Sequence, residues 1–129
     1  MAEEGISPEV KRFISEYIDS VELLEVLLLI RGGGKKEWSI DSVSRELRST
    51  PDSVAKRLGD LCARRLLSKK EGEVHLYHYH PETKELDSAT QRLAQAYAER
   101  RATVIDLIFS KPIDALRHFS DAFKFRKDL

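Results

Sequence analysis

Two short helices separated by only a few residues are predicted in the middle of the chain. The first follows Ser39, whose hydroxyl is placed to cap a helix, and runs to Leu47 with apolar residues on one side. The second begins at Thr50-Pro51, a capping hydroxyl followed by the residue best tolerated in a first helical turn. Two short helices joined by such a tight turn indicate a helix-turn-helix motif.

The second of these helices has two chemically different faces. One face carries Val54, Leu58, Leu61 and Arg65, and the opposite face carries Ser53, Lys56, Arg57, Asp60 and Arg64. A strand over 66–70, a turn at 71–73 and a returning strand over 74–80 follow, and Pro81 ends this hairpin. A hairpin directly after a helix-turn-helix is a wing. The sequence therefore predicts a mainly α fold with a small β-hairpin wing, a winged helix-turn-helix with flanking N-terminal and C-terminal helices.

Apolar periodicity predicts further helices on both sides of this motif. Ser7-Pro8 begins the first helix, and Asp19 with Glu22 forms a capping box for a buried second helix that ends at three consecutive glycines. After the wing, one helix with an imperfect heptad repeat is expected from about Lys84 to Phe109, and a last helix over 113–125. We divide the chain into an N-terminal helix (1–19), a winged helix-turn-helix domain (20–81) and C-terminal helices that join two copies (82–129).

The formal net charge is zero, with 22 Lys and Arg against 22 Asp and Glu, but the charge is unevenly distributed. Residues 1–34 have three basic and seven acidic side chains, residues 35–70 have ten and five, and residues 71–129 have nine and ten. The net charges of the three segments are thus −4, +5 and −1. The positive excess coincides with the helix-turn-helix and the first strand, which favours a negatively charged partner for that segment.

Several classes of protein are excluded by the sequence. The acidic start Met1-Ala2-Glu3-Glu4 is unlike a signal peptide, and the longest apolar run, 26–30, is far shorter than the roughly 18 residues of a membrane span. A single cysteine, Cys62, allows no internal disulfide. We therefore expect a soluble, cytoplasmic protein without membrane association.

The cationic face of the second helix is the strongest candidate binding site. Its first turn is expected in a major groove of duplex DNA, and the preceding turn and the wing are expected on the flanking phosphates. An ordinary solvated helix face is the alternative, since Asp52 and Asp60 dilute the positive charge. The predicted DNA-binding residues are Arg48, Ser49, Thr50, Ser53, Lys56, Arg57, Lys69 and Lys70.

Other motifs favour simpler interpretations. The run 32–36, three glycines followed by two lysines, lacks the preceding strand and the Lys-Ser/Thr pair of a phosphate loop, so we interpret it as a helix end. His78 and His80 share one face of a strand while His75 points the other way, so the three are not expected to bind one metal ion. No catalytic motif is present. We predict no enzyme activity, no cofactor and no metal site.

The spans Trp38 to Leu47 and Thr50 to Leu58, with Leu61, Leu66 and Leu67, resemble the DNA-binding half of bacterial winged-helix transcriptional regulators, broadly MarR-like. The resemblance covers about residues 20–80, and the segment 99–123 is similar to small uncharacterised bacterial winged-helix proteins. It implies sequence-specific binding of double-stranded DNA by a transcriptional regulator, with no effector ligand identified. A winged helix that binds another protein is the alternative.

We also expect a homodimer, because two apolar stripes outside the winged domain are longer than a domain of this size needs to cover. The competing interpretation is that the terminal helices pack on each other within one chain. The residues predicted between two copies are Val10, Phe13, Ile14, Tyr17, Leu93, Tyr97, Val104, Leu107 and Ile108.

Overall fold

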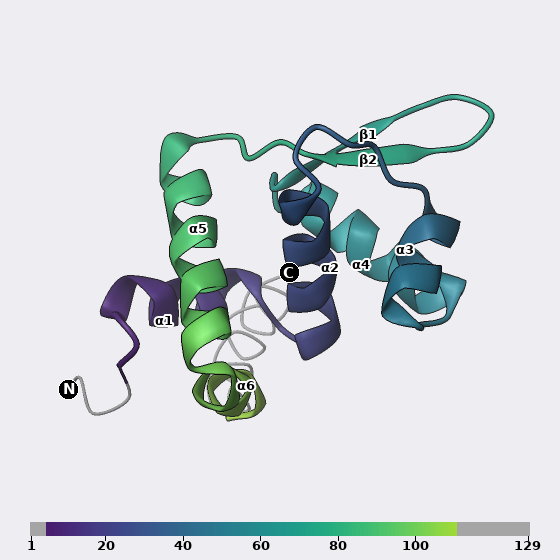
Figure 1. Cartoon of the computed structure of the whole chain (residues 1–129). Coiled ribbons are helices and arrows are strands. Elements are labelled where there is room, and N and C mark those ends of the chain that lie inside the picture. The colour runs from purple at the N-terminus through teal and green to yellow at the C-terminus, as the bar shows by residue number, and fades with distance from the viewer. Residues whose placement is uncertain (1–4, 111–129) are drawn as a thin grey trace, which may run out of the picture.

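The structure, a computed structural model, describes residues 5–110 (Figure 1). The expected last helix over 113–125 lies outside this range. In chain order the elements are α1 (Pro8–Tyr17), α2 (Val21–Gly32), α3 (Ile40–Leu47), α4 (Pro51–Ala63), β1 (Leu67–Lys70), β2 (Leu76–Tyr79), α5 (Lys84–Glu99) and α6 (Arg101–Phe109). The mainly α fold with a small hairpin, predicted from the sequence, is confirmed: it is a winged helix-turn-helix with flanking helices.

Hydroxyl caps set the helix starts. Ser7, Ser39 and Thr50 each accept a hydrogen bond from a backbone N–H in the first turn of α1, α3 and α4, as expected. The predicted start of α2 is wrong by one residue, because the cap is Ser20, whose Oγ lies 3.0 Å from the amide nitrogen of Leu23. Glu22 is consequently free of a capping role and extends its side chain elsewhere.

The wing is an antiparallel hairpin in which Leu67 pairs with Tyr79 and Lys70 with Leu76. Trp38 adds a bridge to its open edge, with backbone N···O distances of 2.8 and 2.7 Å to Tyr77. This bridge ties the segment before α3 to the wing and so fixes the hairpin relative to the helix-turn-helix.

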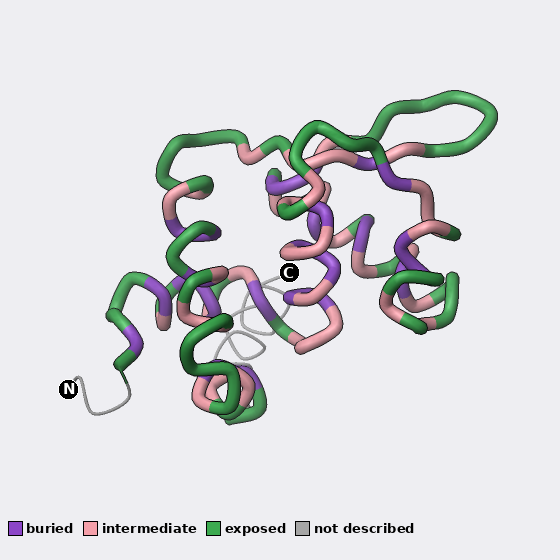
Figure 2. Tube along the Cα trace, viewed as in Figure 1, coloured by how far each residue is buried: buried purple, intermediate pink, exposed green. Residues whose placement is uncertain are grey.

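Helix α2 lies at the centre of the molecule, between the terminal helices on one side and α3 and α4 on the other (Figure 1). Figure 2 shows buried positions along the length of α2, and Val21, Leu28 and Leu29 are partly buried against the same core, so the apolar stretch of the sequence forms the centre of the core. The helix buries Leu23, Leu24, Val26, Leu27 and Ile30 almost completely. Within the described residues, no helix is long and apolar enough to cross a membrane.

The predicted single helix from Lys84 to Phe109 is wrong. The backbone leaves helical geometry at Arg100, with φ −138° and ψ 56°, and α6 starts a new direction after it. The bend allows both α5 and α6 to pack against α1. A continuous helix would carry the apolar residues of α6 away from α1, so burial of that surface favours the bend.

The bend also changes the interpretation of the two apolar stripes. Six of the nine residues predicted between two copies are buried within the chain itself: Val10, Phe13, Ile14, Leu93, Val104 and Ile108. Tyr17, Tyr97 and Leu107 are half-buried against the same core. The competing interpretation, in which the terminal helices pack on each other within one chain, therefore accounts for the six buried residues. The prediction that these six lie between two copies needs correction, because their own chain covers them.

Candidate nucleic-acid interface

The exposed face of α4 carries little positive charge. Lys56 is exposed, and its Nζ lies 4.0 Å from a carboxylate oxygen of Asp60 one turn further on. Asp52 and Gly59 are exposed on the same helix. The expected cationic outer face is therefore reduced, on α4 itself, to one lysine among carboxylates.

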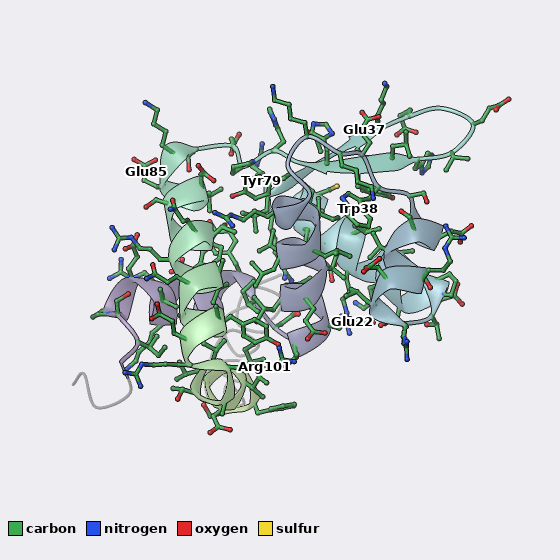
Figure 3. The ribbon with its side chains drawn as sticks, viewed as in Figure 1. Glu22, Glu37, Trp38, Tyr79, Glu85 and Arg101 are labelled. Atoms are coloured by element: carbon green, nitrogen blue, oxygen red, sulfur yellow. The ribbon has the colours of Figure 1, made fainter. Side chains whose placement is uncertain are left out.

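The other predicted cation of this helix points toward α2. Arg57 Nε donates to Oε1 of Glu22 over 2.8 Å, and about a fifth of each side chain is exposed (22% and 23%). The hydroxyl of Ser53 donates to the same oxygen, and Ser49 also hydrogen-bonds to this carboxylate. Figure 3 shows Glu22 near the start of α2. Three of the eight predicted DNA-binding residues thus meet at one carboxylate.

The environment of Glu22 keeps it ionised. Burial by itself raises the pKa of the carboxyl, but the hydrogen bonds from Ser53, Arg57 and Ser49 outweigh burial and lower the pKa below its usual value. Its place in the first turn of α2 acts in the same direction, because a helix N-terminus favours negative charge.

A second ion pair joins α4 to the start of α2. Arg64 lies 3.1 Å from a carboxylate oxygen of Asp19 and donates to the Tyr17 carbonyl over 2.7 Å. Arg57 and Arg64 are seven residues apart and so lie on one side of the helix. The assignment of Ser53, Arg57 and Arg64 to an outward face is wrong, because this side of α4 packs along α2.

The turn between α3 and α4 presents an exposed cation. Arg48 ends α3 with φ 57° and ψ 40°, a left-handed conformation that is costly for a residue with a Cβ. The Ser44 hydroxyl donates to the Ser49 carbonyl and closes the turn. Thr50 is exposed, with its hydroxyl occupied as the cap of α4.

The wing contributes two further exposed cations on β1. Lys69 lies 3.5 Å from Glu71, and Lys70 lies 3.8 Å from Glu37, which precedes α3 (Figure 3). Between wing and α3 is an open cleft of about 310 Å³ lined by Ser39, Ile40, Asp41, Glu73, Val74 and His75. Strand β1, which carries the two lysines, packs against α4, and the turn with Arg48 leads directly into α4.

The three histidines of the wing have different contact partners. His75 lies 3.0 Å from Glu71, whereas the rings of His78 and His80 meet edge to face at 5.7 Å. Among residues 5–110, no group of three His, Cys, Asp or Glu side chains is placed to hold a metal ion. Burial raises the pKa of the Cys62 thiol, which makes it less reactive at neutral pH.

Sequence reasoning missed the acidic partners of these cations. The sequence pattern predicts a capping box for Asp19 and Glu22. Each pairs with an arginine more than 30 residues away. The available signal was the net charge of −4 in residues 1–34 beside +5 in residues 35–70, which favours contact between the two segments without indicating which side chains pair.

The hairpin beside α4, the turn before it and the central α2 define a winged-helix protein. No protein-family model and no curated protein matches the chain. Among solved structures, a double mutant of ZitR from Lactococcus lactis is 15% identical with a TM-score of 0.54, covering 87% of this chain and 77% of that one.

Two further solved structures share the fold. A possible transcriptional regulator from Methanosarcina mazei Go1 is 15% identical, with a TM-score of 0.50 over 74% of this chain and 83% of that one. A ZitR mutant in complex with DNA is also 15% identical, with a TM-score of 0.50 over 81% and 73%. At these identities the comparisons establish a common fold.

Proposed function

We propose that this protein is a transcriptional regulator that binds duplex DNA in a sequence-specific manner, with MarR-like proteins as its closest functional class. The observation that carries the proposal is the exposure of four cations on successive elements that contact one another: Arg48 in the turn after α3, Lys56 on α4, and Lys69 and Lys70 on β1 of the wing. The structural likeness to a ZitR mutant in complex with DNA supports it.

The first turn of α4 would enter the major groove, where side chains reach the base edges. Arg48 and the two wing lysines would lie on phosphates. The ion pairs of Lys69 with Glu71 and of Lys70 with Glu37 are exposed and weak, so a phosphate oxygen can replace the carboxylate at low cost.

Salt dependence of binding tests the proposal. For about six phosphate contacts, we expect the affinity for duplex DNA to fall on the order of 10³-fold between 50 and 200 mM salt. A selection from random duplexes followed by fluorescence anisotropy measures both specificity and slope. Lys70→Ala should weaken binding to all duplexes alike, while Lys84→Ala, on α5 away from the wing, is the control. Absence of binding at low salt would favour the alternative, a protein-interaction module.

We also propose that the regulator acts as a homodimer, because pairing two winged helices doubles the number of base contacts. Among the described residues, the apolar surface that the terminal helices leave for pairing includes the half-buried Leu107 and Phe109, which is 70% exposed. Light scattering at micromolar concentration should give twice 14.8 kDa, and Phe109→Glu should lower the mass. A mass near that of one chain in the unmodified protein would refute the dimer.

Tyr97 is a poor position for that test. Its hydroxyl lies 3.1 Å from a carboxylate oxygen of Glu25, and the Arg101 guanidinium lies over its ring at 4.7 Å. Tyr97→Glu would place a second carboxylate beside Glu25 and destabilise the single chain. A change in mass would then report unfolding as well as association.

A further inference from the structure

Among the described residues, Glu22 accepts hydrogen bonds from more of the predicted DNA-binding residues than any other carboxylate does. It accepts hydrogen bonds from Ser49 in the turn, from Ser53 in the first turn of α4 and from Arg57 one turn later. These donors span the turn and the first two turns of α4, the part that a winged helix places against the bases.

The contact is partly shielded from water. Only 22% of the Arg57 side chain and 23% of the Glu22 side chain are exposed, compared with 65% and 38% for Lys70 and Glu37 in the wing. A charge-assisted hydrogen bond is stronger in such surroundings than at an open surface. A phosphate or a base edge must therefore compete with Glu22 for Arg57. In the exposed ion pairs of the wing, a phosphate replaces the carboxylate partner of the lysine more easily.

We propose that Glu22 withholds Arg57 and Ser53 from DNA and leaves Lys56 as the cation through which α4 faces the duplex. This inference rests on the proposed DNA-binding function. Glu22 is then a positioning residue: it fixes the first turns of α4 against α2 and determines which α4 side chains are available for base contacts. Arg57, which the sequence predicts among the DNA-binding residues, instead stabilises the interface between the two helices.

The test is Glu22→Gln, which keeps an acceptor oxygen but removes the charge, so that a phosphate can displace it from Arg57. Asp19→Asn is the matched control, because it also removes one negative charge from an arginine of α4, at the opposite end of the helix. Binding to a selected duplex is measured between 50 and 200 mM salt for each variant, with thermal unfolding recorded in parallel.

We expect Glu22→Gln to bind more tightly at low salt and to show a log–log salt slope steeper by about 0.9, the value of one added phosphate contact. Over this fourfold range of salt, that slope corresponds to an additional loss of affinity of about 3.5-fold. Asp19→Asn should leave the slope unchanged. Adding Arg57→Ala to Glu22→Gln should return the slope to that of the unmodified protein.

Single substitutions on α4 provide an independent readout. In the unmodified background, Arg57→Ala should change DNA affinity less than twofold while lowering the unfolding temperature, and Lys56→Ala should weaken binding with little effect on unfolding. If Arg57→Ala weakens specific binding as much as Lys56→Ala does, Arg57 contacts DNA and the inference is overturned.

Three other outcomes contradict the inference in different ways. A gain in Glu22→Gln that persists without Arg57 would mean that the carboxylate acts only by repelling phosphates. If the unmodified protein binds no duplex at low salt, the proposed function fails, and the inference fails with it. Binding by the unmodified protein with an unchanged slope in Glu22→Gln refutes the role of Glu22 alone.

Discussion

Truncation of Leu93 to alanine tests whether the terminal helices are stabilised within one chain. Leu93 is fully buried in α5, whose neighbours are α1 and α6. The substitution removes the equivalent of about three methylene groups at ~0.8 kcal/mol each. The cavity left behind adds to this loss, so we expect a destabilisation of about 3 kcal/mol within the range of 2–5 kcal/mol for such changes. For a chain of this size, that corresponds to a fall in Tm of roughly 10–15 °C.

The assay is thermal unfolding followed by far-UV circular dichroism at two protein concentrations a factor of ten apart. Because Leu93 is covered by its own chain, its truncation should lower Tm equally at both concentrations. Val74→Ala in the wing, where the side chain is 60% exposed, should change the stability by no more than about 0.5 kcal/mol. A loss in Leu93→Ala that grows on dilution would instead place this residue between two copies, by mass action, and refute the reasoning.

Two further predictions concern the turn and the wing. Arg48→Gly should stabilise the chain by about 1 kcal/mol in thermal unfolding, because φ 57° suits glycine, and should also weaken DNA binding in anisotropy titrations. Burial and then the hydrogen bond to Asp87 raise the pKa of Tyr79 to about 12, so the folded state favours the neutral phenol. The stabilisation is present below pH 10 and is lost as the pH rises toward 12. Urea unfolding at pH 8 should show the unmodified protein to be about 1 kcal/mol more stable than Tyr79→Phe. This difference in the free energy of unfolding should become smaller between pH 10 and pH 12, and a difference that stays constant would contradict the prediction.

Local chemistry explains why much of the fold could be predicted from sequence. A hydroxyl followed by proline specifies a helix start within three residues, and the caps at Ser7 and Thr50 are confirmed. The hairpin is specified in the same way, by two apolar–polar runs around Glu71-Gly72-Glu73. Both signals depend on residues only a few positions apart, so they can be recognised directly in the sequence.

The bend at Arg100 and the partners of α4 depend on contacts between distant segments. Nothing in the local sequence of 84–109 ends a helix, and the bend brings α6 against α1, which is more than 80 residues away in sequence. The same holds for Arg57, whose helical position is compatible with solvent until α2 is placed beside it. The sequence could therefore identify the candidate interface but not which of its side chains are already occupied.

An excess of basic residues in one segment of the sequence does not by itself produce a positively charged surface. Of the ten cations in residues 35–70, six lie within 4.0 Å of a carboxylate in the described part of the chain: Lys56, Arg57, Arg64, Arg65, Lys69 and Lys70. Their value for binding an anion depends on how each pair is solvated. The exposed pairs of the wing contribute little to stability and can exchange a carboxylate for a phosphate, whereas Arg57 with Glu22 is shielded and exchanges at a greater cost. Solvent exposure of the ion pairs, more than the number of cations, therefore determines which of these residues can contact DNA.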